Sequence, residues 1–205
     1  MNSIIFDLDG TLWDPLDVVV GAWNQVLKEN NMKEEVEKED LKGVMGLQPQ
    51  EIGAKLFPHL PEGQCKELTE RSSELECECL SRMGGQLYDG VEAVLEELSR
   101  KYKLFIVSNC QEGYIESFFA YHKLGKFFLD FENPGRTGLS KGENIGLIME
   151  RNGLTDAIYV GDTIGDQQAA RHAGIPFVYA AYGFGEVYSF DYSIHGFEEL
   201  LELFG

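Results

Sequence analysis

The stretch IIFDLDGT at residues 4–11 decides the fold, because an apolar run stops abruptly at two carboxylates. Residues 4–6 carry the β-branched and aromatic side chains typical of a short buried strand. Asp7 and Asp9 follow at once, and Gly10 then allows a tight turn and a close approach of the backbone. A buried strand that ends in paired carboxylates and a glycine indicates a polar site at the end of that strand.

Two later apolar runs end in polar residues in the same way. LFIV at residues 104–107 is followed by Ser108 and Asn109. IYV at residues 158–160 is followed by GDTIGD at residues 161–166. The carboxyl ends of parallel strands meet at one edge of a sheet, and ligands bind at that edge. We therefore expect the following polar residues to gather there: Asp7, Asp9, Ser108, Asn109, Asp162 and Asp166.

Strand-like and helical segments alternate along most of the chain. Short apolar runs typical of strands occur at residues 4–7, 103–109, 127–131, 157–162 and 176–181. Segments with the apolar spacing of helices occur at residues 91–102, 115–124, 141–152, 165–173 and 197–204. Strands that are apolar on both faces and alternate with helices predict an α/β fold with a doubly wound parallel sheet.

The section from residue 15 to residue 84 interrupts this alternation. It has no strand-like run, and it is far longer than an ordinary connection between elements. Its helical patterns lie at residues 15–30, 52–57 and 62–83. Gly84 and Gly85 mark the point where the pattern changes. We predict a core domain of residues 1–14 and 85–205, with an all-α domain of residues 15–84 inserted after the first strand.

The composition limits the classes of partner. The chain has 205 residues and a formal net charge of −18. A surface this acidic repels nucleic acid and anionic membranes, so we expect neither as a partner. An anion-binding site in this chain would need its own local positive charge. Acidic residues concentrate in helical-looking stretches such as EEVEKED and ELECEC, and we interpret most of these residues as solvated helix faces.

The sequence also indicates a compartment. No apolar stretch approaches the ~20 residues that a membrane span needs, and the N-terminus lacks the features of a signal peptide. The cysteines have no zinc-binding spacing, so we expect free thiols in a reducing cytosol. They are Cys65, Cys77, Cys79 and Cys110. We predict a cytoplasmic protein, either a monomer or a homodimer.

Carboxylates gathered in one small site repel one another and need a positive partner. Mg²⁺, a hard divalent cation that prefers oxygen ligands, fits this need, with Asp7 and Asp162 as direct ligands. Lys141, at the start of a predicted helix, is the candidate for neutralising the remaining anionic charge, and the Ser108 hydroxyl is a further donor to an anion. Because a Mg²⁺ site that keeps several waters leaves room for a phosphate oxygen, the pattern indicates a phosphoryl-transfer centre.

The motifs and their order resemble those of the haloacid dehalogenase (HAD) superfamily of hydrolases. They are D-x-D-G-T after an apolar strand, a strand ending in Ser108, a single Lys141, and G-D-x-x-x-D at residues 161–166. The resemblance spans residues 4–204 and implies a Rossmann-like core with a helical cap, here residues 15–84, as in the phosphoglycolate phosphatase and β-phosphoglucomutase branch. It implies a Mg²⁺-dependent phosphatase that hydrolyses a small phosphorylated metabolite through an aspartyl-phosphate.

The resemblance also implies roles for single residues. Asp7 matches the nucleophile, and Asp9 matches the general acid/base, which also gives a backbone carbonyl to the metal. Asp162 matches a direct metal ligand, and Asp166 matches the acidic residue that supports the water shell of the metal. The residues implied in phosphate binding are Thr11, Ser108, Asn109 and Lys141. Dehalogenases of the family lack an acid at the position of Asp9, so the resemblance favours phosphoryl transfer over cleavage of a carbon–halogen bond.

Two features lie outside the shared motifs. Members of this branch often have proline after the lysine, whereas this chain has Gly142, preceded by Ser140 and Lys141 in a helix start. We expect Ser140 to cap that helix and Lys141 to keep its role. The loop GVMGLQ at residues 43–48 has two glycines between helices, and we expect it to face the substrate from the cap.

Three alternatives stay open from the sequence. A phosphomutase of the β-phosphoglucomutase type shares the centre but passes the phosphoryl group to a sugar in place of water. A signalling receiver module also phosphorylates an aspartate with Mg²⁺ and a lysine, but such modules are shorter and lack a second acid two residues later. A non-catalytic binding protein on the same scaffold would not need the complete set of motifs.

Overall fold

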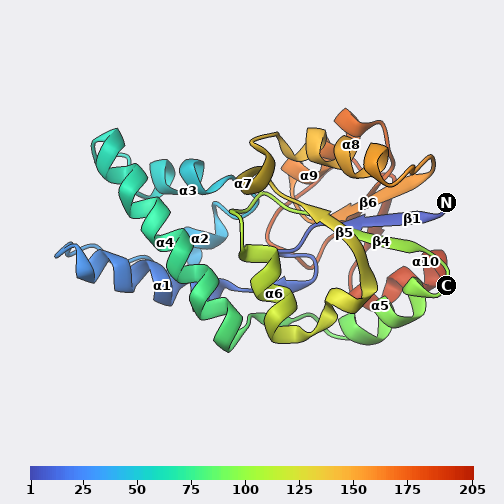
Figure 1. Cartoon of the computed structure of the whole chain (residues 1–205), viewed down its shortest axis with the longest axis horizontal. Coiled ribbons are helices and arrows are strands. Elements are labelled where there is room, and N and C mark those ends of the chain that lie inside the picture. Colours follow the sequence, from blue (N-terminus) through green and yellow to red (C-terminus); the bar gives the residue numbers. More distant parts are fainter.

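The central element of the structure is a six-stranded parallel β-sheet (Figure 1). The computed structural model describes residues 1–205. The strands are β1 (Ser3–Phe6), β4 (Lys103–Val107), β5 (Phe128–Glu132), β6 (Ala157–Gly161), β7 (Phe177–Ala180) and β8 (Tyr192–Ile194). They lie in the order β5-β4-β1-β6-β7-β8, and every neighbouring pair is parallel. β1 therefore lies between β4 and β6, and the predicted α/β fold is confirmed.

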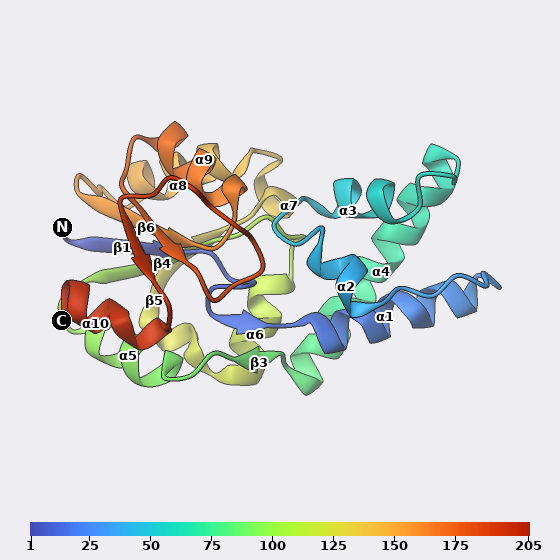
Figure 2. The ribbon, with the colours of Figure 1, turned by 180° about the vertical axis from the view of Figure 1, so that it is seen from behind.

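Helices cover both faces of this sheet (Figures 1 and 2). One face packs against α5 (Val91–Ser99), α6 (Tyr114–His122) and α10 (Leu200–Phe204), and the other against α8 (Lys141–Arg151) and α9 (Ile164–Ala173). Ile4 and Phe6 of β1 belong to the first core, whereas Ile5 belongs to the second. Because successive side chains of a strand point to opposite faces, a strand buried on both faces is apolar throughout, as this one is.

Four helices extend away from the sheet, at the left of Figure 1. They are α1 (Leu16–Glu29), α2 (Lys38–Lys42), α3 (Pro49–Leu56) and α4 (Glu62–Met83). The chain enters this group through β2 (Trp13–Asp14) and leaves it through β3 (Gln86–Leu87), and these two strands pair antiparallel. An all-helical insertion after β1 agrees with the predicted architecture, while the proposed domain limits, residues 1–14 and 85–205 against 15–84, stay a prediction.

Several short elements of the structure were not predicted from the sequence. β2 and β3 have two residues each, and β8 has three residues, of which Tyr192 is 46% exposed. Such segments are too short to show a hydrophobic period. The helix predicted at residues 197–204 is a 3₁₀ turn, η2 (Phe197–Glu199), followed by α10. The other short elements are η1 (Leu124–Phe127) and α7 (Pro134–Thr137).

Two further sequence expectations concern cysteines and membranes. All four cysteines are free thiols. None of the helices combines the length and the apolar character that crossing a lipid bilayer requires.

Candidate active site

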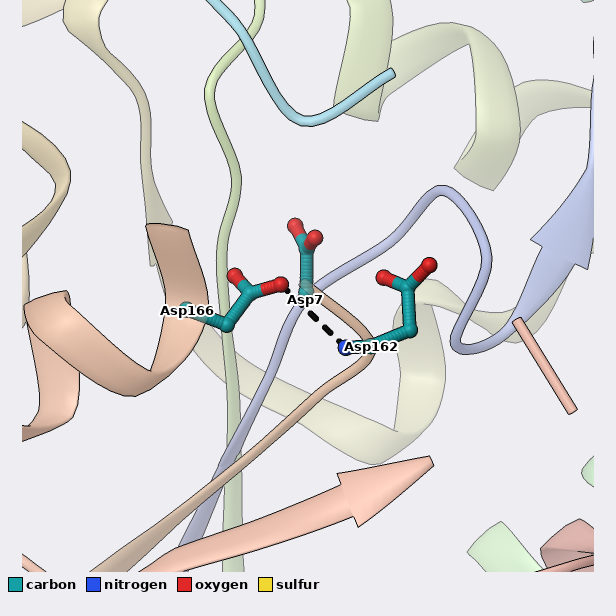
Figure 3. Close-up of side chains that lie close together, drawn as sticks. All are labelled: Asp7, Asp162 and Asp166. Atoms are coloured by element: carbon teal, nitrogen blue, oxygen red, sulfur yellow. Dashed lines mark hydrogen bonds between the residues drawn. The ribbon is translucent and has the colours of Figure 1, made fainter. Parts of the chain in front are cut away.

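Three carboxylates meet at the carboxyl edge of the sheet (Figure 3). Asp7 directly follows β1, Asp162 directly follows β6, and Asp166 lies in the first turn of α9. One oxygen of each carboxylate lies within 4.8 Å of the other two, and all three residues are buried. The Asp7 amide donates to the carbonyl of Val160 at 2.8 Å, which extends the β1–β6 ladder and fixes the backbone of Asp7. Residues predicted from two separate motifs, D-x-D-G-T and G-D-x-x-x-D, therefore share one centre.

Lys141 joins this centre from the first turn of α8. Its Nζ lies 3.0 Å from Oδ1 of Asp7 and 2.5 Å from Oδ1 of Asp166, and the side chain is buried. Burial disfavours its charged form, but the two carboxylates outweigh this and raise the pKa of Lys141 above its ordinary value. Ser140 caps the helix as expected, because its Oγ accepts from the amide of Glu143 at 3.3 Å.

Asp166 is saturated with hydrogen bonds from the chain itself. Its Oδ1 accepts from Lys141 and from the Tyr159 hydroxyl at 3.3 Å. Its Oδ2 accepts from the Thr163 amide at 2.9 Å, the Thr163 hydroxyl at 2.6 Å and the Asp162 amide at 3.2 Å, the last drawn as a dashed line in Figure 3. Although burial opposes ionisation, Lys141 and Thr163 hold the pKa of Asp166 below its ordinary value. Asp166 therefore orients Lys141 and the Asp162 loop.

Asp7 and Asp162, by contrast, each have an oxygen that no donor of the chain satisfies. Asp162 Oδ2 accepts from the Phe184 amide at 2.7 Å, but its Oδ1 has no partner. Asp7 Oδ1 has only the ion pair with Lys141, which is close but not aligned as a hydrogen bond. Burial, with Asp166 adding repulsion, raises the pKa of Asp7 to about 6 and that of Asp162 well above its ordinary value. Buried, unsatisfied carboxylate oxygens in a cluster fit a hard divalent cation such as Mg²⁺.

Asp9 lies in the same region, and only one of its two carboxylate oxygens accepts hydrogen bonds from side chains of the chain. Its Oδ1 accepts from Nε1 of Trp13 at 2.7 Å and from the hydroxyl of Tyr114 at 3.2 Å. Both donors reach the same oxygen, so Oδ2 is left to carry a proton. Burial and the neighbouring Asp7 raise the pKa of Asp9 to about 8, so it holds a proton at neutral pH. Neither Trp13 nor Tyr114 was assigned to the site from the sequence.

Two glycines permit close approaches around the centre. Gly10 has a φ of +74°, and a Cβ at this position would overlap the carboxylate of Asp162. A Cβ at Gly142 would lie 2.9 Å from His172 on α9. Gly142 therefore lets the start of α8, and with it Lys141, pack closely against α9.

The predicted phosphate-binding residues occupy different places. Ser108 and Asn109 line the cavity above Asp7, and the Ser108 hydroxyl forms a hydrogen bond that lowers the pKa of Asp7 against the larger effect of burial. Nδ2 of Asn109 donates to the carbonyl of Gly46 in the cap at 2.8 Å. Thr11 does not line this cavity, and its buried Oγ1 has no partner, so a phosphate contact of Thr11 stays a prediction.

On the other side, the cavity above Asp7 and Asp9 is lined by residues of the cap, from helices α1, α2, α3 and α4 and the loop between α2 and α3. It has a volume of about 40 Å³. Met45 and Leu47 of the loop at residues 43–48 line it, as expected, whereas Gln48 does not. The Gln48 amide instead donates to Oε2 of Glu51 at 3.0 Å at the start of α3. The cap therefore presents mainly apolar side chains to the site.

Glu76 of α4 is the exception among these cap residues. Its Oε1 accepts from Nε1 of Trp23 at 2.7 Å, and its Oε2 accepts from Nε2 of Gln111 at 2.9 Å. Burial raises the pKa of Glu76 to about 7, although both hydrogen bonds oppose this. The interpretation of ELECEC as a solvated helix face is wrong for this residue, which is 7% exposed and lines the cavity. Charge alone does not tell which side of a helix packs inward.

The shifted pKa of Glu76 predicts how stability depends on pH. It rises from 4.5 to about 7 on folding, so the folded chain holds the proton more tightly and wild-type stability falls as pH rises through this interval. We compare the free energy of unfolding of Glu76→Gln with that of wild type. We expect the difference to shift in favour of the variant by about 2–3 kcal/mol as the pH rises from about 5 to about 8. Urea unfolding in EDTA at both pH values measures this difference. Glu78→Gln, an exposed change on the same helix, should show none, and an equal difference at both pH values for Glu76→Gln would contradict the prediction.

A doubly wound sheet with an acidic centre at its carboxyl edge and a helical insertion after β1 defines a class of hydrolase. Residues 4–180 match the haloacid dehalogenase-like hydrolase family, and the chain belongs to this family. The resemblance identified from the four motifs is thereby confirmed.

Within this family of hydrolases, the chain is similar to proteins described as phosphatases. A phosphoglycolate phosphatase from Synechococcus elongatus is 30% identical over 189 residues, which cover 91% of this chain and 86% of that protein. Another phosphoglycolate phosphatase, from Xylella fastidiosa, is 28% identical over 197 residues, covering 89% of this chain and 81% of that protein. A haloacid dehalogenase-like hydrolase of known structure from Streptococcus pneumoniae has a TM-score of 0.87 at 25% identity, covering 100% of this chain and 99% of that chain. These similarities confirm the predicted enzyme class, a phosphatase.

Proposed function

We propose that this chain is a Mg²⁺-dependent phosphatase that hydrolyses a small phosphate monoester through a phosphorylated Asp7. The observation that carries the proposal is the pair of buried, unsatisfied oxygens on Asp7 and Asp162 beside Lys141, below a cavity lined by the cap. The cytoplasmic location predicted above is part of this proposal, since four free thiols fit a reducing compartment.

In the first half-reaction, a carboxylate oxygen of Asp7 attacks phosphorus and the ester bond to the leaving oxygen breaks. Asp9 gives its proton to the leaving alkoxide, for which its raised pKa and free Oδ2 are suited. Lys141 and the Ser108 hydroxyl hold the phosphoryl oxygens and offset their charge. The products of this step are the free alcohol and an aspartyl-phosphate.

In the second half-reaction, Asp9 acts as the base. Its carboxylate removes a proton from water, and the water oxygen attacks the phosphorus of the aspartyl-phosphate. The bond between phosphorus and Asp7 breaks, and inorganic phosphate leaves. Both carboxylates return to their starting protonation states. Trp13 and Tyr114 keep Asp9 oriented in both halves, because they bind only its Oδ1.

Asp7 and Asp162 would hold the metal, with the backbone carbonyl of Asp9 as a further candidate ligand. Bound there, Mg²⁺ would supply positive charge to the phosphoryl oxygens and offset the mutual repulsion of the carboxylates. Asp166 is less suited to direct ligation, because donors of the chain already bind both of its oxygens. Its contribution is to position Lys141 and Asp162.

The proposal is tested by phosphate release from p-nitrophenyl phosphate and from a panel of phosphorylated metabolites. We expect turnover with Mg²⁺ and a loss of at least about 100-fold in EDTA. Mg²⁺ should also raise the thermal midpoint of wild type, because a ligand that binds only the folded chain stabilises it. Turnover that is unchanged in EDTA would contradict the role of the metal.

Asp162→Asn should raise the Mg²⁺ concentration for half-maximal activity by at least about tenfold and remove the Mg²⁺-dependent thermal shift. Asp89→Asn is the matched control, because Asp89 is exposed and makes no hydrogen bond or ion pair within the chain. Incubation with hexose phosphates separates the phosphatase from the phosphomutase alternative. Free phosphate supports the proposed function, whereas an isomerised sugar phosphate without phosphate release supports the mutase.

A further inference from the structure

The cavity above Asp7 and Asp9 is lined by acidic side chains and by no basic ones. Among its 17 lining residues are three carboxylates, Asp7, Asp9 and Glu76, and none is lysine, arginine or histidine. Lys141 does not line it and lies instead beside Asp7 and Asp166, where the phosphoryl group would bind. Asp7 and Asp9 are assigned to the phosphoryl chemistry, so Glu76 is the acid left to contact the rest of the substrate.

Glu76 is held in a fixed orientation at the cap side of this cavity. Trp23 and Gln111 each donate one hydrogen bond, to different oxygens of the carboxylate, and no cationic side chain forms an ion pair with it. Each oxygen therefore keeps a lone pair that can accept a further hydrogen bond. Apolar side chains surround this position, among them Val19 and Ile52.

A buried carboxylate without a countercharge is costly in free energy, and its cost falls when a cation binds it. A ligand that carries a second carboxylate into this cavity would add repulsion to that cost. A ligand with an ammonium group would supply both the missing countercharge and hydrogen-bond donors. The cavity has a volume of about 40 Å³. So narrow a space favours a small leaving group.

We propose that the substrate is the phosphate monoester of a small amino alcohol, and that Glu76 determines this specificity by pairing with its ammonium group. The inference rests on the proposed phosphatase function and deepens it. It separates this chain from the phosphoglycolate phosphatases that it resembles, because the substrate in their name carries a carboxylate where we expect a cation.

Three esters of matched size test the inference on the wild-type enzyme with Mg²⁺. They are 2-aminoethyl phosphate, 2-hydroxyethyl phosphate and 2-phosphoglycolate, which present a cation, a neutral hydroxyl and an anion at the same distance from phosphorus. We expect kcat/KM to fall in that order, with at least about 100-fold between the amine and the carboxylate. The inference is overturned if 2-phosphoglycolate is hydrolysed best, or if the amine is no better than the hydroxyl.

Two variants, Glu76→Gln and Glu78→Gln, test whether Glu76 is the residue that determines the preference for the amine ester. Glu76→Gln should lower the ratio of kcat/KM for the amine over the carboxylate by about tenfold or more, because the amide keeps the shape and removes the charge. Glu78→Gln removes the same charge from the exposed face of α4 and should leave the ratio unchanged. An unchanged ratio in Glu76→Gln would overturn the assignment. If that variant does not fold, the order of the three esters on wild type decides the inference alone.

p-Nitrophenyl phosphate distinguishes a wrong leaving-group specificity from a wrong phosphatase function. Its hydrolysis needs the phosphoryl-transfer centre but no ammonium group. If it is hydrolysed and the amine ester is not preferred, the phosphatase function stands and the inference about the leaving group is wrong. If neither it nor any of the three esters is hydrolysed, the proposed function fails and the inference fails with it.

Discussion

Asp7→Asn abolishes turnover, with kcat falling by about 10⁵–10⁶-fold, the scale on which enzymes lose rate when their nucleophile is removed. An amide cannot form the acyl-phosphate bond on which both half-reactions depend. The assay is release of nitrophenolate from p-nitrophenyl phosphate with Mg²⁺, followed from the first turnover. We expect neither an initial burst nor a steady state above the background rate.

Two controls accompany this variant. Asp89→Asn should keep wild-type turnover, because this exposed aspartate lies outside the site. The thermal midpoint of metal-free Asp7→Asn should be no lower than that of metal-free wild type, because burial already disfavours the ionised form and raises the pKa of Asp7 to about 6. Normal hydrolysis by a folded Asp7→Asn variant would remove Asp7 as the nucleophile and overturn the proposed mechanism.

Asp9→Asn should separate the two half-reactions. Nitrophenolate is a stable leaving group without protonation, so the first step proceeds and one equivalent of nitrophenolate is released per enzyme. The second step lacks its base, and the steady-state rate should fall by about 10²–10⁴-fold. The measurement is a stopped-flow burst, with acid-quenched protein checked for covalently bound phosphate.

An alkyl phosphate provides the comparison for Asp9→Asn. Its alkoxide needs the proton of Asp9, so we expect no burst and no trapped phosphoenzyme with this substrate. The same burst with both esters would show that Asp9 does not act as the acid. Steady turnover of p-nitrophenyl phosphate at the wild-type rate would show that it does not act as the base.

Much of the centre was predictable because parallel strands impose a common direction. Asp7 and Asp162 each directly follow a strand that can be recognised in the sequence by its run of three or more apolar residues. The two strands, β1 and β6, are neighbours in the sheet. Two strand ends that are far apart in the chain must then lie side by side. Lys141 was found by its place at a helix start, which Ser140 caps.

The donors that orient Asp9 could not be predicted in the same way. Tyr114 lies 105 positions away on α6, and nothing in its local sequence distinguishes it from a core tyrosine. Trp13 is fully buried on a strand of only two residues, β2, which is too short to show a period. Their meeting on one oxygen depends on how α6 packs beside β2, and that is a property of the whole fold.

Glu76 shows the same limit for the cap. In sequence it is one acid of ELECEC, indistinguishable from Glu74 and Glu78, which are exposed. Its burial depends on the angle at which α4 packs against α1, where Trp23 donates to it, and against the loop after β4, where Gln111 donates to it. A charge pattern along one helix does not contain either of these contacts.

The sequence by itself determined five of the six strands of the sheet, the edge at which the acidic residues gather and the kind of chemistry they support, because strand periodicity and strand ends are local properties. Only the tertiary structure decided which oxygens stay unsatisfied, which donors hold Asp9, and which acid of the cap lines the cavity. Those outcomes depend on contacts between elements distant in the chain, and packing geometry sets such contacts.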